Sequence, residues 1–160
     1  MILKYYYWYY KNGISKEVVA EIIKESKKIK KEIALTGDLS KKDLKSKKKL
    51  ERLKKTRDCN VKWLNKKWIY NLIHPYIADA NSAAGWNFDI NFTEQAQFTI
   101  YSKDKYYGWH EDQFEQPIFC PKDKDRHGKI RKLSVTISLS DPEDYEGGNL
   151  EFDMRNQKDW

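Results

Sequence analysis

Hydrophobic residues recur along this chain with two different periods. After Ser15 they return every three to four positions, which predicts an amphipathic helix with Ser15 as its cap and Gly37 as its stop. The apolar stripe of this helix comprises Val18, Val19, Ile22, Ile23, Ile29 and Ile33. A second helical pattern covers residues 61–84, and Pro75 is expected to kink or break that helix near His74.

Period-two alternation and aromatic runs predict strands elsewhere. Residues 2–10 are rich in aromatics and end at a turn signal, residues 11–13, so we expect a first strand there. From Gly85 onward, alternation predicts strands of a sheet with one buried face. The alternating positions are Trp86, Phe88, Ile90, Phe98, Ile100, Leu133, Val135, Ile137, Leu139, Leu150 and Phe152. Residues 117–128 are predicted to form a polar loop and residues 140–148 a turn.

Helices followed by strands indicate an α+β fold. The length of 160 residues suits a single domain spanning 1–160. Within it we expect a strand and helix over 1–37, a lysine-rich insert over 38–57, a helix over 58–84 and sheet strands over 85–160. An aromatic content of 14% excludes an intrinsically disordered chain.

The positive charge is concentrated in the insert. The formal net charge is +7, and residues 38–57 carry ten basic and three acidic residues, so the other 140 residues are formally neutral. The leucines of this segment are too sparse to bury a face, which predicts either a solvated helix or a mobile loop. The net charge therefore carries no information about the substrate of the remaining domain.

The cysteines and the apolar runs bear on the compartment. Cys59 and Cys120 are too few for a disulfide framework and match no zinc spacing, which favours two reduced thiols. The N-terminal aromatic run lacks the features of a signal peptide, and no stretch reaches the length of a membrane span. We therefore expect a cytoplasmic protein that does not contact a membrane.

Candidate chemistry lies in residues 97–112. On a strand, positions i and i+2 share a face, so His110 and Asp112 can direct an imidazole nitrogen and a carboxylate oxygen to one point. Two histidines and one carboxylate form the facial triad of Fe(II) oxygenases, of which this pair supplies two groups. Taken alone, such a pair is also common on protein surfaces.

The wider pattern resembles the prolyl-4-hydroxylase-like family of 2-oxoglutarate- and Fe(II)-dependent oxygenases, especially its compact bacterial and phage members. In that family a tyrosine-rich strand leads into His-x-Asp, and a later block is similar to residues 131–152. The resemblance extends back over residues 81–89 and covers about residues 58–152. It implies a double-stranded β-helix (jelly-roll) core, here incomplete, with flanking N-terminal helices.

The resemblance also implies roles for individual residues. His110 and Asp112 become catalytic iron ligands, Tyr101 the phenol that hydrogen-bonds 2-oxoglutarate, Tyr107 a wall of the pocket, and Leu150 a group that packs on the cosubstrate. Both tyrosines and Leu150 are also compatible with ordinary core packing. A further departure from the family is Asp104, which stands where many members have glycine.

The third iron ligand and the basic residue for 2-oxoglutarate are not evident. In the family both follow the second block, whereas His127 precedes it in a hydrophilic loop and His74 adjoins Pro75, so each is expected to be structural. Two explanations stay open: a C-terminally truncated fragment, which we favour, or a natural short form that has lost the iron site. In either case this chain is expected to bind iron and cosubstrate weakly.

The activity implied by the resemblance is hydroxylation of a C–H bond with Fe(II) and 2-oxoglutarate, with ascorbate as a further cofactor to test. The products are succinate and CO₂, and the implied substrate is a peptidyl prolyl or similar side chain. The alternative is a catalytically inactive binding module that contacts nucleic acid or another anionic partner through Lys41 to Arg57. That segment lacks interleaved aromatics for base stacking.

Overall fold

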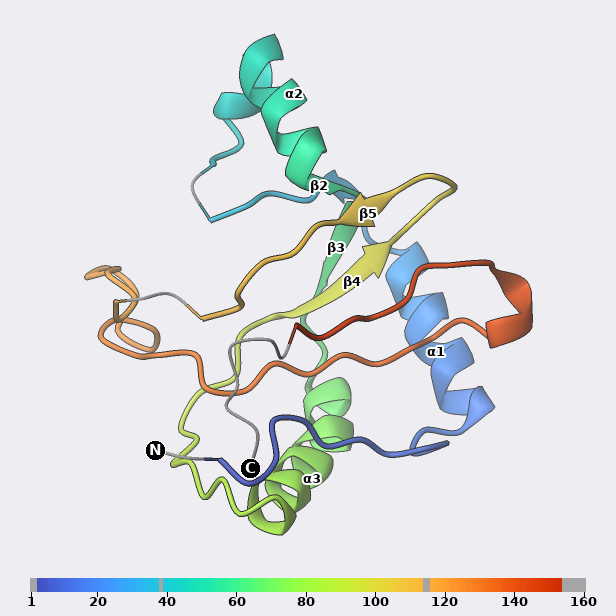
Figure 1. Cartoon of the computed structure of the whole chain (residues 1–160), viewed down its shortest axis with the longest axis vertical. Coiled ribbons are helices and arrows are strands. Elements are labelled where there is room, and N and C mark those ends of the chain that lie inside the picture. Colours follow the sequence, from blue (N-terminus) through green and yellow to red (C-terminus); the bar gives the residue numbers. More distant parts are fainter. Residues whose placement is uncertain (1–2, 38, 114–115, 154–160) are drawn as a thin grey trace.

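The computed structural model describes residues 3–37, 39–113 and 116–153. Within these ranges the chain forms helices and two small antiparallel sheets, followed by a long irregular segment (Figure 1). The elements are α1 (Lys16–Lys27), β1 (Glu32–Ile33), the 3₁₀ helix η1 (Asp43–Lys45), α2 (Lys47–Thr56), β2 (Arg57–Asp58), β3 (Asn60–Leu64), α3 (Lys67–Ala83), β4 (Ala96–Ile100), β5 (Tyr106–Tyr107) and the 3₁₀ helix η2 (Pro142–Asp144).

The first helix begins where the sequence predicts and ends earlier. The Ser15 hydroxyl accepts a hydrogen bond from the Val18 amide, so Ser15 is the cap of α1. The helix stops at Lys27, which makes the predicted extension to Gly37 wrong, and Ile33 lies in β1. Pairing of β1 with β3 satisfies the backbone there and buries Ala34, which outweighs the continued helical period.

β3 is the central strand of the larger sheet, with order β1-β3-β4. Its residues Val61 and Leu64 are 2% and 3% exposed. The predicted helix over residues 58–84 is therefore wrong at its start, where the chain is extended and paired on both edges. β4 confirms the predicted strand through Phe98 and Ile100.

α3 packs at one end of this sheet, where β3 ends and β4 begins, and completes the main core (Figure 1). Ile69 of α3 packs with Ile22 of α1 and Leu64 of β3, and all three are almost completely buried. The helix continues through Pro75, so the predicted break near that residue is wrong. Proline removes one backbone hydrogen bond, but helical residues on both sides of it are held by packing, with Ala80 buried beyond it.

The lysine-rich insert is helical in its second half. Of the two predicted alternatives, α2 confirms the helix, and one of its leucines, Leu53, is 1% exposed, contrary to the prediction that no face is buried. Asp38, the first residue of the insert, lies outside the described residues. The helix leads directly into β2, which pairs with β5 in the second sheet.

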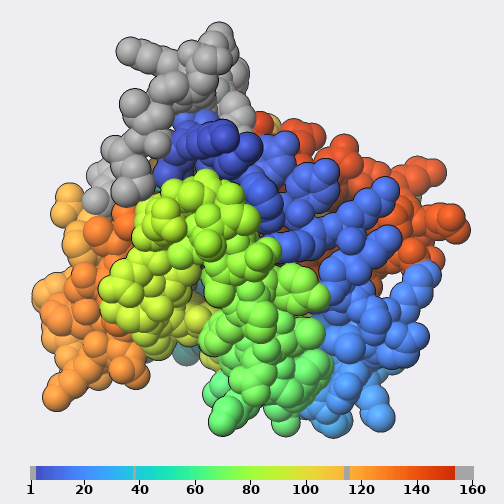
Figure 2. Space-filling model, turned by 90° about the horizontal axis from the view of Figure 1, so that it is seen from below, coloured from blue at the N-terminus to red at the C-terminus, as the bar shows by residue number. Residues whose placement is uncertain are grey.

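The predicted N-terminal strand is absent from residues 3–10, and Ile2 lies outside the described residues. These residues form an irregular segment whose aromatic rings remain between 37% and 74% exposed. Contacts fix it to α3 and beyond: the Tyr10 hydroxyl donates to the Tyr76 carbonyl, and the Trp86 indole donates to the Tyr5 carbonyl. Figure 2 shows this segment in dark blue against α3 in green. The aromatic residues of this segment therefore contact α3 and Trp86, but among the described residues no neighbouring strand pairs with their backbone.

The predicted strands around residues 86–90, 133–139 and 150–152 are also absent from the described residues. Residues 116–153 contain turns, η2 and extended backbone, but no sheet pairing. The polar loop over 117–128 and the turn over 140–148 are confirmed as irregular and turn-containing backbone. Helix and sheet together agree with an α+β fold, whereas a jelly roll is not evident in the described residues.

Candidate functional site

The candidate site begins at β5, where Tyr107 and His110 stack. Their ring centres are 3.6 Å apart and the planes differ by 12°. Tyr107 pairs across the sheet with Arg57, whose guanidinium carbon lies 4.3 Å from the centre of the tyrosine ring. The Tyr107 ring, which is held by the pairing of β2 with β5, therefore orients the imidazole of His110 by stacking.

Backbone groups hold His110 in one orientation. Its Nδ1 lies 2.7 Å from the carbonyl oxygen of Gly108, and the Gly108 amide donates to the Thr56 carbonyl at 2.8 Å. Because a carbonyl can only accept, Nδ1 carries the hydrogen and Nε2 faces the other way. Such a hydrogen bond from the second ring nitrogen is the usual arrangement of a metal-ligating histidine.

His110 Nε2 and Asp112 Oδ1 lie 3.2 Å apart. A carboxylate oxygen and an imidazole lone pair at this distance repel one another unless a proton or a cation lies between them. Neighbouring donors of an octahedral first-row metal, with bonds of about 2.1 Å, are roughly 3 Å apart. The pair fits two such positions, although it lies on irregular backbone rather than on the predicted strand.

Arg131 fixes Asp112 from a distant part of the chain. Its Nη1 donates to the Asp112 carbonyl at 2.6 Å, and its Nε and Nη2 contact Glu94 Oε2 at 2.8 and 2.5 Å. This bridge was not identified as functional from the sequence. The signal available was a basic residue at the start of the block that resembles the oxygenase family, but its partners are 19 and 37 positions away.

A buried guanidinium lies beneath the site. Arg57 is 7% exposed, and it donates to the Leu35 carbonyl at 3.0 Å, to Gln97 Oε1 at 2.6 Å and to the Cys59 sulfur at 3.4 Å. Sequence reasoning treated this residue only as the end of the lysine-rich insert. Its burial depends on β2, β4 and the chain after β1 coming together, which no local pattern reveals.

Tyr101 follows β4 beside Arg57, Cys59 and Tyr107, and it is 51% exposed, so its burial is only partial. Burial and the neighbouring Cys59 thiol raise the pKa of Tyr101 to about 12, with Arg57 opposing the increase. Burial also raises the pKa of Tyr107, where Arg57 again acts in the opposite direction. Both phenols therefore keep their protons at neutral pH and can donate hydrogen bonds.

Asp104 lies in the loop between these two tyrosines. Its φ is 62°, in the left-handed region that glycine adopts without penalty and that aspartate tolerates better than most residues. The loop therefore requires the backbone conformation expected of glycine, although another residue stands there.

Other predicted residues are not brought to the pair. The Leu150 side chain is mostly open, at 65% exposure. His127 Nδ1 accepts from the Cys120 amide at 3.2 Å, and His74 Nε2 contacts Thr93 at 3.0 Å, which agrees with the structural roles expected of both. Across residues 3–37, 39–113 and 116–153, no group of three or more His, Cys, Asp or Glu side chains could hold a metal. Within these residues His110 and Asp112 stay a pair of candidate ligands.

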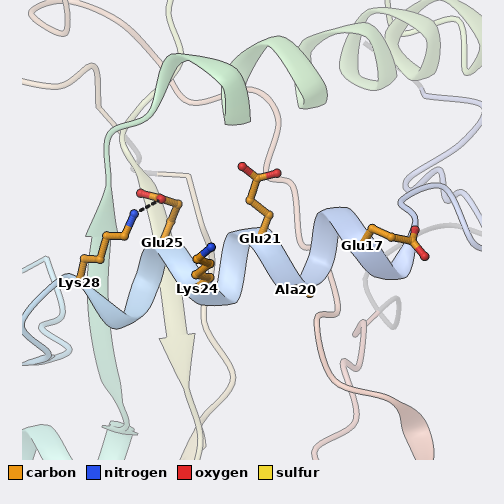
Figure 3. A pocket seen from close by; sticks show the side chains of 6 residues that line it. All are labelled: Glu17, Ala20, Glu21, Lys24, Glu25 and Lys28. Carbon is orange, nitrogen blue, oxygen red and sulfur yellow. Dashed lines mark hydrogen bonds and ion pairs between the residues drawn. The ribbon is translucent and has the colours of Figure 1, made fainter.

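A surface hollow elsewhere does not add to the site. It lies along α1 and is lined by Glu17, Ala20, Glu21, Lys24, Glu25 and Lys28 (Figure 3). Glu25 and Lys28 form an ion pair there, and the lysine hydrogen bond lowers the pKa of Glu25. The lining comes from one exposed helix face, so this hollow is open and separate from His110 and Asp112. None of the described helices has the length and apolar character needed to cross a membrane.

Comparison with known proteins adds one match. Residues 96–160 match the family model described as 2OG-Fe(II) oxygenase superfamily. The match contains Tyr101, Tyr107, His110, Asp112 and Leu150, whereas Arg57 and the lysine-rich insert precede it. No curated protein and no solved structure matched the chain. Residues 96–160, less than half of the chain, are thus similar to this superfamily.

Proposed function

We propose that this protein is a 2-oxoglutarate- and Fe(II)-dependent dioxygenase whose site is built around His110 and Asp112. The observation that carries the proposal is their separation of 3.2 Å, with His110 Nδ1 directed to a backbone carbonyl so that Nε2 faces the carboxylate. The family match over residues 96–160 supports the same chemistry. The same match favours a catalytically active oxygenase over the alternative, an inactive binding module.

Bound iron and 2-oxoglutarate would supply oxidative decarboxylation and C–H hydroxylation, with succinate and CO₂ as products. His110 Nε2 and Asp112 Oδ1 would hold the metal, while the Gly108 carbonyl keeps the imidazole in the required tautomer. The Tyr107 ring limits rotation of His110 by stacking. Arg131 holds the backbone of Asp112 through the hydrogen bond to its carbonyl.

Tyr101 would donate its phenolic hydrogen to a carboxylate oxygen of 2-oxoglutarate. Its pKa of about 12 keeps that hydrogen in place throughout the physiological range. Tyr107 would form one side of the same pocket. The suggested contact of Leu150 with the cosubstrate requires that its exposed side chain become covered in the loaded protein.

The finer assignment rests on the resemblance of the sequence. We propose a prolyl-4-hydroxylase-like subtype, a peptidyl prolyl or similar side chain as substrate, and a cytoplasmic location. Ascorbate is a cofactor to test by addition. No third ligand is assigned among the described residues, and weak binding and truncation both stay predictions.

The test measures succinate formed from 2-oxoglutarate with excess Fe(II) under air. Because excess Fe(II) offsets the weak binding expected of this chain, we expect slow turnover by the unmodified chain. At least about 90% of it should be lost in His110→Ala and Asp112→Ala, because each removes a proposed ligand. His127→Ala is the matched control, since its imidazole lies in the loop before Arg131 and contacts Cys120. Equal turnover in all four proteins, or none that requires Fe(II), would contradict the proposed site.

A further inference from the structure

The exposed side of η1 and α2 forms a basic surface, which we define as Lys42, Lys45, Lys47, Lys48, Arg52, Lys54 and Lys55. In Figure 1 α2 projects from one end of the molecule, on the side away from α3. All seven residues are exposed to solvent. The chain outside residues 38–57 is formally neutral, and the net charge of the protein is therefore located here.

Most of this charge is not neutralised within the described residues. Lys41 pairs with Glu32, and Lys49 pairs with Asp43, whose pKa is strongly lowered by the lysine hydrogen bond. By contrast, none of the described carboxylates forms an ion pair with any lysine of the basic surface, namely Lys42, Lys45, Lys47, Lys48, Lys54 and Lys55. These six ammonium groups are available to an external anion.

Part of this charge arrangement opposes the stability of α2. Lys47 and Lys48 occupy the first turn, where the positive end of the helix dipole disfavours cations. Lys48 and Arg52 are four positions apart and Arg52 and Lys55 three, so like charges also meet on one face. Lys54 and Lys55, in contrast, lie in the last turn, where the helix dipole favours cations. A bound polyanion would relieve the repulsion at the start of the helix and between its like charges.

The base of the helix is nevertheless held firmly. Leu53 is 1% exposed, and the Tyr106 hydroxyl donates to the carbonyls of Lys54 and Lys55 at 3.0 Å each. The amide of Gly108, which lies two residues before His110 in the chain, donates to the Thr56 carbonyl. The basic surface is thus attached to the candidate site through β2 and β5. These contacts fix the orientation of α2 before any partner binds.

We propose that this surface binds the phosphate backbone of duplex nucleic acid without sequence preference. A duplex carries one negative charge per about 1.7 Å of its axis, so it offers an anion to each lysine along α2. The helix presents no exposed aromatic for base stacking, which favours backbone contact over recognition of unpaired bases. It also presents no exposed apolar residue that could enter a bilayer. Binding here does not depend on the oxygenase activity.

The experiment measures fluorescence anisotropy of a labelled 20-base-pair DNA duplex at KCl concentrations from 50 to 200 mM. The test variant is K47A/K48A/K54A/K55A. The matched control, K11A/K103A/K122A/K124A, removes the same charge from exposed lysines in other parts of the chain. Circular dichroism of each protein checks that the fold is kept, which is expected because alanine favours helices.

We expect the test variant to bind at least about tenfold more weakly at 50 mM KCl, and the slope of log affinity against log salt to become shallower by about 3. The control should stay within about threefold of the unmodified protein. Three outcomes would overturn the proposal: no duplex binding, equal weakening in both variants, or binding to phosphatidylserine vesicles in place of the duplex. Retained succinate formation in the test variant would keep this result separate from the proposed function.

Discussion

Two regions of this molecule contain similar hydrophobic alternation and fold differently. In the packed region, residues 16–107, the strands have neighbours and the core side chains of β3 are 2–3% exposed. In the extended region, residues 116–153, Leu139 packs against the main core, but Phe119, Val135 and Leu150 are 85%, 53% and 65% exposed. Alternation creates an apolar face, but burial also requires a partner strand or helix to cover it.

The candidate site lies where these two regions meet. His110 is oriented from the packed region by Tyr107 and the Gly108 carbonyl. Arg131 of the extended region donates a hydrogen bond to the Asp112 carbonyl and another to the Glu94 carboxylate. One candidate ligand is thus supported by a formed sheet and the other by a single arginine that bridges it to Glu94, and the difference can be measured.

The largest expected effect compares two leucines. Leu64→Ala removes a side chain that is 3% exposed and should lower the free energy of unfolding by about 2–5 kcal/mol. Leu150→Ala removes one that is 65% exposed and should change it by less than about 0.5 kcal/mol. Urea denaturation followed by circular dichroism measures both. A comparable loss in Leu150→Ala would show that the extended region has a core of its own in solution.

A smaller effect isolates the bridge between the regions, and it rests on the proposed metal site. Arg131→Leu should weaken anaerobic Fe(II) binding about tenfold, because Asp112 loses a group that positions it. The unfolding free energy should fall by no more than about 1 kcal/mol, since the ion pair with Glu94 is partly exposed. Calorimetric titration measures the affinity.

Arg126→Leu is the control for that measurement. Arg126 pairs with Asp123 and lies 3.9 Å from Glu94, but it does not hydrogen-bond Asp112. Its replacement should leave Fe(II) affinity nearly unchanged. If both variants lose affinity equally, the effect belongs to the acidic and basic cluster as a whole and not to the Asp112 bridge.

The smallest expected effect is the pH dependence of the free energy of unfolding that comes from Tyr101. Its pKa of about 12 exceeds the unfolded value of about 10, so the folded protein keeps a proton that the unfolded chain releases. Its contribution to stability is therefore full below pH 10 and falls as the pH rises toward 12. Absorbance titration at 295 nm should show a late-ionising phenol that is lost in Tyr101→Phe. If Tyr101→Phe instead removes a phenol that ionises near pH 10, partial burial does not raise the pKa of Tyr101.

Local sequence predicted those features whose partners are close in the chain. The Ser15 cap needs only the amide three residues on, and the strand through Phe98 and Ile100 follows from alternation. The closeness of His110 and Asp112 follows from a spacing of two residues, even though their backbone is irregular. β3 was missed because Val61 and Leu64 also fit the helical period of the residues that follow.

By itself, then, the sequence determined the start of α1, the concentration of charge between residues 38 and 57, and the pairing of an imidazole with a carboxylate. Tertiary structure alone decided the burial of Arg57 against Leu35 and Gln97, which are 22 and 40 positions away, and the bridge from Glu94 through Arg131 to Asp112. The physical reason is that a buried charge and a long-range hydrogen bond require partners that the chain brings together only after its strands have paired.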